Sequence, residues 1–307
     1  MAPQRSTRCV GVVAIALLLS ACASSAPPEG PASALDDDAV TVASFDFPES
    51  ELLAELYGQA LRAAGHDVDL VPRAGPRELV GPALAGGVVE LVPEYAGTAV
   101  QFLSLGEVDG SPDAATNHAA LEDELASRDL VALDPAPAQD RNTFVVTTAT
   151  AAQHGLRDLS DLRGKATGLR LGGPPECPTR PLCLPGLRDR YGLRFAEFVA
   201  LDASGPLTVQ ALEQGLVDVA LLFTTHPEVG TGLVALGDDR SLQPAENVTP
   251  VLHREALRRF GADVTAPLDR VSGRLTTGAL RSLNAQVADG RAPADVAAAW
   301  LAAEGLA

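Results

Sequence analysis

The stretch Leu84–Thr98, LAGGVVELVPEYAGT, predicts the end of a helix, a glycine turn, a buried strand and then an aromatic residue in a loop. Gly86 and Gly87 end the helix, and four of the five residues after them are apolar. Proline cannot donate a hydrogen bond within a central strand, so Pro93 is expected to end the pairing and Tyr95 to lie just beyond it. Ligands of open α/β sheets bind at the carboxyl ends of the strands, which makes Tyr95 a candidate binding residue.

The same arrangement occurs once more, 128 residues further along, where Ala211–Val219 matches Ala83–Leu91. Counted from the shared glycine, an acidic residue follows after three positions, an aromatic residue after eight and a threonine soon afterwards. These residues are Glu90, Tyr95 and Thr98 in the first copy and Asp218, Phe223 and Thr224 in the second. Either copy alone is equally well explained as an ordinary helix–glycine–strand unit of an alanine-rich protein. The pair together indicates two similar α/β lobes that present an aromatic residue to a shared cleft.

The length of 307 residues exceeds one typical domain and suffices for a full core, so two domains are expected. Hydrophobic residues make up 46% of the chain and charged residues 21%, which is typical of a globular protein. The formal net charge of −17 argues against a nucleic-acid partner and for a protein of the cell envelope.

Residues 1–21 have the features of a secretory signal peptide, namely two arginines, a short apolar run and a small-residue cleavage site. Leu19-Ser20-Ala21-Cys22 resembles the lipobox of bacterial lipoproteins, in which the cysteine becomes the lipidated N-terminus. The alternative is an ordinary signal peptide with an incidental cysteine. Residues 22–39 then comprise the lipidated Cys22 and a flexible linker rich in Pro, Ser and Asp.

The four cysteines divide by position. Cys9 leaves with the signal peptide and Cys22 takes the lipid, which leaves Cys177 and Cys183 as a pair in an oxidising compartment, where a disulfide is expected. Zinc ligands usually come two to four residues apart and in fours, so no metal site is expected. The closed ring would stabilise the fold by about 2 kcal/mol through loop entropy.

The apolar segments after the linker indicate a β-α-β-α-β order. Strands are expected at Val40–Ser44, Asp67–Pro72 and 88–94. One helix begins near Pro48, with Asp46 as a possible N-cap, and the second covers Gly75–Ala85. The N-terminus of the first helix is expected to point free N–H groups at the cleft, ready for an anion.

Two antiparallel crossings between the lobes are expected at Asn142–Thr148 and Pro244–Leu252, because a second crossing returns the chain to the first lobe. Lobe 1 then comprises residues 40–143 and 249–307, and lobe 2 comprises residues 144–248. The other expected elements are helices at Asp113–Arg128, Leu187–Tyr191, Thr277–Val287 and Pro293–Ala303 and strands at Val131–Leu133 and Gly168–Leu171.

The sequence contains no recognisable catalytic motif, because it lacks Gly-x-Ser-x-Gly, His-Glu-x-x-His and Walker motifs. Gly230–Ala235 matches the GxGxxA dinucleotide fingerprint, but that motif must follow a strand and open a helix. Leu233–Leu236 instead has the pattern of a strand. We therefore expect neither an enzyme nor a cofactor.

Taken together, the segments resemble the substrate-binding lipoproteins of osmoprotectant ABC importers, the glycine betaine/choline/quaternary amine family. The resemblance runs from about Thr41 to Leu301 and is carried by SFDFPES (44–50), Arg77-Glu78, PEYAGT (93–98), GGPPE (172–176), LPGL (184–187), Asp218-Val219 and LTT (275–277). It implies an α/β fold of the two-lobe type II periplasmic-binding-protein-like kind, with hinge-linked Rossmann-like lobes. It also implies an ABC permease as partner and a lipid-anchored monomer on the outer face of the cytoplasmic membrane.

The resemblance further implies an aromatic cage for a trimethylammonium group. Tyr95 matches a cage tyrosine, and Phe223 stands where the family usually has a tyrosine. Val209 and Gly81 stand at positions that can be aromatic, and His226 replaces a usual aspartate. The ligand-binding residues expected on this basis are Phe45, Asp46, Phe47, Tyr95, Thr98, Glu176, Phe223, Thr224 and Thr225. The ligand's anion would be held by the amides of Phe45–Glu49 and by Thr224 or Thr225.

Because Val209 and Gly81 stand where the family can have aromatic residues, the cage has fewer rings and leaves room for a ligand bulkier than glycine betaine. A larger zwitterion such as ergothioneine or carnitine is therefore the alternative ligand. An exported α/β enzyme and a purely structural envelope lipoprotein are the alternative functions; the first would show turnover and the second no saturable binding of small molecules.

Overall fold

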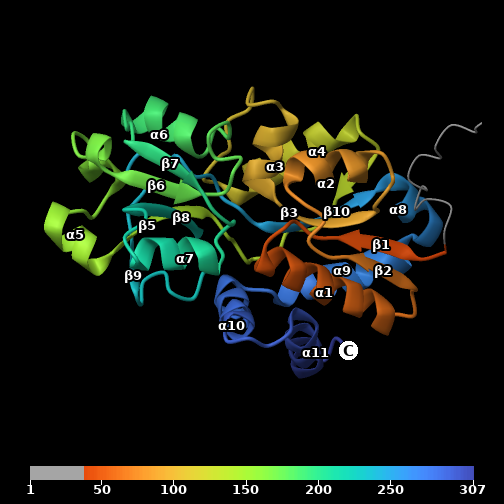
Figure 1. Cartoon of the computed structure of the whole chain (residues 1–307). Helices are drawn as coiled ribbons and strands as arrows, with labels where there is room; N and C mark the ends of the chain where they lie inside the picture. The colour runs from red at the N-terminus through yellow and green to blue at the C-terminus, as the bar shows by residue number, and fades with distance from the viewer. Residues whose placement is uncertain (1–37) are drawn as a thin grey trace, which may run out of the picture. The chain divides into compact units, whose positions relative to one another are not determined.

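The computed structural model describes residues 38–307 (Figure 1). The predicted signal peptide, Cys22 and the linker up to residue 37 lie outside the described residues. Within residues 38–307, no helix is long and apolar enough to cross a membrane.

Lobe 1 is built on a five-stranded sheet of order β2-β1-β3-β10-β4. β1 pairs in parallel with β2 and β3, whereas β10 pairs antiparallel with β3 and β4. The strands are β1 (Val40–Ala43), β2 (Val68–Val71), β3 (Leu91–Tyr95), β4 (Leu130–Ala132) and β10 (Val248–His253).

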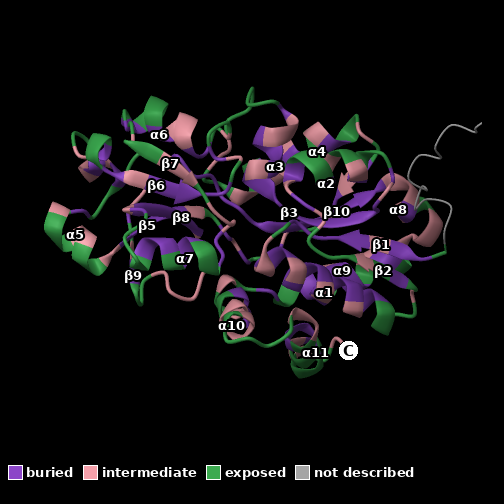
Figure 2. Ribbon diagram, viewed as in Figure 1, coloured by how far each residue is buried: buried purple, intermediate pink, exposed green. Residues whose placement is uncertain are grey.

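Helices cover this sheet because each has an apolar face to bury. In α1 (Pro48–Ala63) the residues Leu52, Leu53, Leu56 and Leu61 are buried, as their helical spacing predicts. The other helices of lobe 1 are α2 (Arg77–Ala85), α3 (Ala96–Leu103), α4 (Ala114–Ala126), α8 (Arg254–Phe260), α9 (Ala262–Arg274), α10 (Thr277–Ala288) and α11 (Pro293–Glu304). Figure 2 shows the strands largely buried and the outer helix faces exposed.

Lobe 2 has a second five-stranded sheet, of order β7-β6-β8-β5-β9. Its strands are β5 (Asn142–Thr147), β6 (Arg170–Gly173), β7 (Glu197–Ala200), β8 (Val219–Phe223) and β9 (Leu233–Ala235). Its helical segments are α5 (Thr148–His154), η2 (Leu159–Leu162), η3 (Ala166–Gly168), α6 (Leu184–Tyr191) and α7 (Pro206–Glu213). The strand expected at Leu233–Leu236 is confirmed as β9, so Gly230 and Gly232 do not open a helix.

The structure confirms the repeated unit in detail. Both turn glycines adopt the left-handed conformation, with φ of 69° at Gly87 and 67° at Gly215. The acid three residues on has the same role in each lobe, because Glu90 accepts from Thr41 N at 3.2 Å and Asp218 from Arg170 N at 2.8 Å. The aromatic residue ends its strand opposite the start of a crossing strand, as Tyr95 pairs with Val248 and Phe223 with Asn142.

The two connections between the lobes run side by side. The first crossing, predicted at Asn142–Thr148, lies a few residues earlier, because that stretch is β5 within the sheet of lobe 2. Gln139 and Asn247 form an antiparallel bridge. On either side of it, Asp140 N donates to Glu246 O and Val248 N to Ala138 O, both at 3.0 Å. These hydrogen bonds tie the outgoing and returning segments together between the two sheets.

The prediction that Pro93 ends the pairing is wrong. Pro93 lies inside β3 and pairs with Pro250 of β10. Neither proline has an N–H, and facing residues at a non-hydrogen-bonded position of an antiparallel ladder need none. On its other edge β3 meets β1 only at Leu91, so no ladder partner requires a donor from Pro93 there. Tyr95 is likewise not in a loop, because it is both the last residue of β3 and the N-cap of α3.

Asp46 does not cap α1. The N-cap is Phe47, and Asp46 is exposed and paired with Arg73 at 3.1 Å. The strand expected at Gly168–Leu171 is β6, two residues later, and it includes Gly172 and Gly173. A Cβ on Gly172 would lie 2.7 Å from Leu201 Cδ1, so this glycine serves close packing within a strand.

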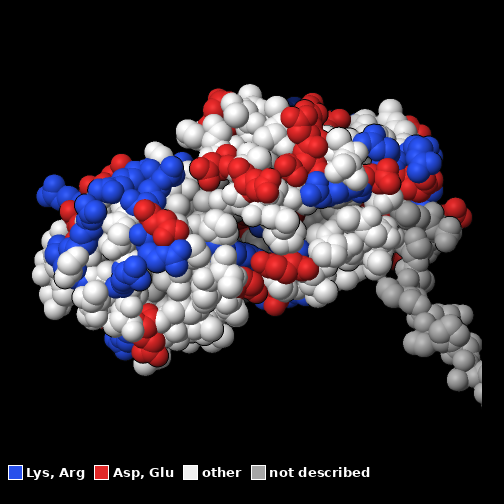
Figure 3. All heavy atoms as spheres, turned by 90° about the horizontal axis from the view of Figure 1, so that it is seen from above, with Lys and Arg blue, Asp and Glu red and all other residues white. Residues whose placement is uncertain are grey.

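Charge is unevenly distributed over the face drawn in Figure 3. Basic side chains gather mainly over lobe 2, and acidic side chains form a band over lobe 1 near α3 and α4. Any partner that touches both lobes on this face must therefore complement charges of both signs.

Candidate ligand-binding site

A cavity of about 360 Å³ lies at the carboxyl ends of β1, β3 and β8. Lobe 1 contributes Phe45 and Tyr95, lobe 2 contributes Glu176 and Phe223, and the connecting segments contribute Glu246. Its volume falls within the range of small-molecule sites. No group of His, Cys, Asp or Glu within residues 38–307 is placed to hold a metal ion.

Aromatic rings form a continuous cluster along the cavity. The Phe47 ring lies 6.2 Å from Phe45, 6.0 Å from Tyr95 and 5.1 Å from Phe223, measured between centroids. Phe47 therefore links the predicted aromatic residues of lobe 1 to Phe223 of lobe 2. Such rings offer their faces to a cation.

Phe102 of α3 also lines the cavity. It was not among the predicted site residues, because no helix was predicted at α3. A Cβ on Gly81 would lie 3.3 Å from Phe102 Cε1. The space expected beside Gly81 is thus occupied by another aromatic ring. Val209 lines a second cavity, of about 450 Å³, which meets the first at Phe47 and Phe223.

A buried ion pair supports the wall beneath the rings. Arg77 binds Glu94 at 2.8 Å, donates to Thr98 Oγ1 at 3.0 Å, and lies 5.0 Å from the centre of the Phe45 ring. Thr98 in turn donates its amide to Glu246 at 3.0 Å. Thr98 is therefore part of the wall's hydrogen-bond network.

A second network of buried polar groups joins the lobes. Glu49 accepts from Tyr95 Oη at 2.7 Å and from Thr225 Oγ1 and Asn284 Nδ2. Burial raises the pKa of Tyr95 well above its usual value, so the hydroxyl stays neutral and donates. Burial, and then the charge of Glu49, raises the pKa of Asp140 well above its usual value.

The loop amides expected to hold an anion already have partners. Phe45 N donates to Ser50 Oγ at 2.8 Å, Asp46 N to Gly75 O at 3.1 Å and Phe47 N to Phe45 O at 2.9 Å. The loop satisfies its own donors, because Ser50 folds back from the first turn of α1. These three amides are therefore not available to a ligand.

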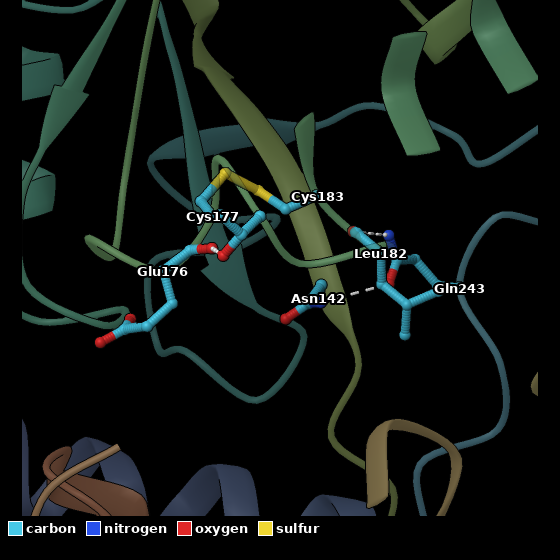
Figure 4. The surroundings of a disulfide bond; sticks show 7 residues. Asn142, Glu176, Cys177, Leu182, Cys183 and Gln243 are labelled. Atoms are coloured by element: carbon cyan, nitrogen blue, oxygen red, sulfur yellow. Dashed lines mark hydrogen bonds between the residues drawn. A yellow bond between two sulfur atoms is a disulfide. The ribbon is translucent and has the colours of Figure 1, made fainter. Parts of the chain in front are cut away.

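The loop after β6 carries the disulfide between Cys177 and Cys183, whose Cα atoms are 5.2 Å apart. Figure 4 shows that the loop is attached to Gln243, which in turn is bonded to Asn142 of β5. Gln243 Nε2 donates to Leu182 O at 2.9 Å, and Asn142 Nδ2 donates to Gln243 Oε1 at 3.3 Å. The bonded loop holds Glu176 at the cavity wall.

The structure brings most of the predicted site residues together. Those that line the cavity are Phe45, Asp46, Phe47, Tyr95, Thr98, Glu176 and Phe223. Thr224 and Thr225 do not; Thr224 Oγ1 and Thr225 N donate to Asp140, and Thr225 lines the second cavity. His226 also lines the second cavity, where burial lowers its pKa and Nδ1 accepts from Glu228 N at 3.2 Å.

Comparison with known proteins identifies the family to which this two-lobe chain is similar. The family described as the substrate binding domain of ABC-type glycine betaine transport system, OpuAC, matches residues 38–303. The chain belongs to this family. OpuAC domains are the substrate-binding components of such transport systems.

Individual relatives agree with this assignment. The glycine betaine-binding protein YehZ of Escherichia coli (strain K12) is 27% identical over 282 residues, which cover 87% of this chain and 90% of the relative. The solved structure of apo YehZ aligns with a TM-score of 0.62 and 26% identity over 88% of this chain and all of that one.

Two further solved structures share the fold. A glycine betaine/carnitine/choline ABC transporter protein gives a TM-score of 0.68 at 23% identity, covering 87% of this chain and 99% of the other. A choline-binding protein in complex with choline gives 0.61 at 16% identity, covering 86% and 88%. This OpuAC chain thus has the two-lobe fold of periplasmic binding proteins.

Proposed function

We propose that this OpuAC protein binds a quaternary ammonium solute in the cleft between its lobes and delivers it to an ABC import permease. The observation that carries the proposal is the aromatic cluster of Phe45, Phe47, Tyr95 and Phe223, which draws on both lobes. A desolvated quaternary ammonium gains most from such rings, because it has no hydrogen-bond donors to lose. YehZ is named for binding glycine betaine, which supports the same class of ligand here.

The binding residues in this proposal are the predicted cavity residues together with Phe102. Tyr95 and Phe223 would face the ammonium group from the two lobes, and Phe47 would close the wall between them. Neither lobe alone surrounds a small molecule, so binding would favour the closed arrangement of the lobes.

The protein would act outside the cytoplasmic membrane as a lipid-anchored monomer, held by Cys22. A single acyl chain binds membranes only marginally, so stable anchoring needs the several chains of a processed lipoprotein. Cys22→Ser is expected to release the protein into the soluble fraction of the expressing cells. A variant that stays as membrane-bound as the wild type would contradict the anchor.

Calorimetric titration with tetramethylammonium, choline and glycine betaine tests the ligand class. Tetramethylammonium reports the cage alone, because it carries neither hydroxyl nor carboxylate. We expect saturable binding at one site per chain for at least one of the three. Carnitine and ergothioneine belong in the same series as the bulkier zwitterions. Both also carry a trimethylammonium group, so saturable binding of these two alone would keep the quaternary ammonium class and narrow it to bulkier zwitterions. Binding of none of the five would contradict the proposed ligand class.

A further inference from the structure

The loop closed by the disulfide, residues 177–183 of lobe 2, reaches across to lobe 1. Arg180 of this disulfide loop binds Glu78 of α2 through two hydrogen bonds, from Nη2 to Oε2 at 2.8 Å and from Nε to Oε1 at 3.2 Å. The next residue, Pro181, also lies close to lobe 1, since a Cβ on Gly106 would be 3.9 Å from Pro181 Cγ. The disulfide loop therefore contacts both α2 and the segment that follows α3.

Glu78 and Arg180 lie at the mouth of the cavity, where it opens to solvent. Both residues line the cavity, and their side chains are 43% and 34% exposed. Phe45 and Tyr95 line the same cavity and are buried. A solute held by these rings therefore lies deeper than the ion pair, which spans the mouth from one lobe to the other.

The disulfide holds the backbone of Arg180 in position (Figure 4). Arg180 N donates to Glu176 O at 3.1 Å, and Cys183 N donates to Arg180 O at 3.0 Å. Both cysteines are buried in the core of lobe 2. A short closed ring leaves its backbone few other conformations, so the guanidinium reaches Glu78 at little cost in conformational entropy.

The Arg180–Glu78 pair is ionised at neutral pH. Partial burial would raise the pKa of Glu78, but the hydrogen bonds and the charge of Arg180 outweigh it, so this pKa is lowered. Two parallel N–H···O bonds between a guanidinium and a carboxylate are the geometry in which a partly exposed ion pair contributes most.

We propose that the disulfide loop is a clasp over the mouth of the cavity, fastened to lobe 1 by the Arg180–Glu78 ion pair. The clasp holds the lobes together over a bound solute, and the solute leaves when the pair separates. The partner of Arg180 in this role is a residue of the opposite lobe and not the solute. The inference rests on the proposed function, because it concerns the release of solute from the same site.

Charge reversal in the full chain tests the clasp. Glu78→Arg and Arg180→Glu each place like charges at the mouth, whereas the double variant restores an opposite pair with the positions exchanged. Calorimetry measures the affinity of all four proteins for tetramethylammonium, choline, glycine betaine, carnitine and ergothioneine. The direct effect of each variant on the charge of the solute cancels in such a cycle.

We expect the double variant to bind about as tightly as the wild type. The product of the two single losses in affinity should exceed the loss in the double variant roughly tenfold, because each single variant replaces attraction by repulsion. Exposed Glu122 of α4 and exposed Arg163 provide the control reversals, Glu122→Arg and Arg163→Glu. Their effects should multiply without any coupling.

The contribution of the disulfide is tested in the same cycle. Cys177→Ala combined with Cys183→Ala removes the ring, so the loop no longer holds Arg180 opposite Glu78. The coupling between the two charge reversals should then fall to about twofold. Coupling that stays at the wild-type level without the disulfide would overturn its place in the clasp.

Hydrogen exchange of the ligand-free chain detects the clasp without a solute. The amides of Thr179, Arg180 and Cys183 should exchange several-fold faster in Glu78→Arg than in the wild type, because the loop is freed from lobe 1. Glu122→Arg should leave their exchange unchanged.

The outcomes separate the two proposals. If none of the five compounds binds, the proposed function fails, and hydrogen exchange decides on the clasp: faster exchange in Glu78→Arg supports it and equal exchange overturns it. If compounds bind but the two single losses simply multiply in the double variant, only the clasp fails, as it would if Arg180 served the solute directly. If a reversal does not fold, Glu78→Gln and Arg180→Gln complete the cycle, with an expected coupling of about threefold; no coupling there overturns the clasp.

Discussion

Tyr95 joins the aromatic wall of the cavity to the buried carboxyl of Glu49. Its ring lies 6.0 Å from that of Phe47, and its hydroxyl donates to Glu49 at 2.7 Å. Tyr95→Ala should weaken binding of the preferred quaternary ammonium roughly tenfold, because one face of the cage is lost. Tyr95→Phe keeps the ring and should bind more tightly than Tyr95→Ala. Calorimetry measures both, and normal binding by Tyr95→Ala would contradict the assignment.

Asp140 makes the stability of the ligand-free protein depend on pH. Because burial and Glu49 raise its native pKa above the unfolded value of about 3.9, the native state holds a proton that the unfolded state loses. Stability should therefore fall as the pH rises from about 4 through the native pKa, and Glu246 acts in the same direction. Thermal unfolding between pH 5 and pH 9 should show this fall in wild type and a flatter profile in Asp140→Asn. An unchanged slope in Asp140→Asn would exclude this role.

Site residues that follow a recognisable sequence pattern could be predicted, whereas those placed only by tertiary packing could not. Tyr95 and Phe223 were found because each follows its turn glycine by eight positions. Phe102 and Glu246 reach the cavity through α3 and the returning segment, which are placed by tertiary packing. The anion site predicted at the amides of Phe45–Glu49 is contradicted at Phe45, Asp46 and Phe47, because these three amides donate to Ser50 Oγ, Gly75 O and Phe45 O within the protein.

At the scale of elements, the glycine turns that end α2 and α7 fix where β3 and β8 begin. Gly215 has φ of 67°, and a Cβ added to it would have no other atom within 4 Å. A larger residue there would therefore be strained by its backbone conformation and not by a steric clash. Gly215→Ala should lower the free energy of unfolding by about 1 kcal/mol. Gly168→Ala is the matched control, because Gly168 is equally open and has no positive φ. Chemical denaturation measures both; equal stability of the two variants would refute the role of the turn.

Elements with a clear hydrophobic period were predicted within a few residues, whereas others depend on close packing. α1, α10 and α11 begin at or close to the predicted positions. α3 was missed because Gly97 does not suggest a helix. A Cβ there would lie 2.5 Å from Pro244 Cγ, so this glycine lets α3 pack on the returning segment. β7 was missed because its four residues are all at least partly exposed.

At the scale of the whole molecule, the repeat and the two β-branched crossings were enough to predict two lobes, since each lobe repeats one strand–helix plan. The sequence predicted lobe 1 at residues 40–143 and 249–307 and lobe 2 at residues 144–248. We propose boundaries a residue or two earlier, at 141/142 and 247/248, because β5 of lobe 2 begins at Asn142 and β10 of lobe 1 begins at Val248. The contacts between lobes could not be predicted, because they join residues such as Glu49 and Thr225, 176 positions apart.

The central claim is that the ligand is bound between the two lobes and holds them together. Small-angle X-ray scattering, with and without a saturating concentration of the quaternary ammonium that binds most tightly in calorimetry, tests it most directly. Because cavity groups come from both lobes, we predict a smaller radius of gyration with ligand. At a ligand concentration about tenfold above the wild-type Kd, Tyr95→Ala with its roughly tenfold weaker binding would be about half bound and should show about half the change. A profile of the wild type that is identical with and without saturating ligand would contradict the account.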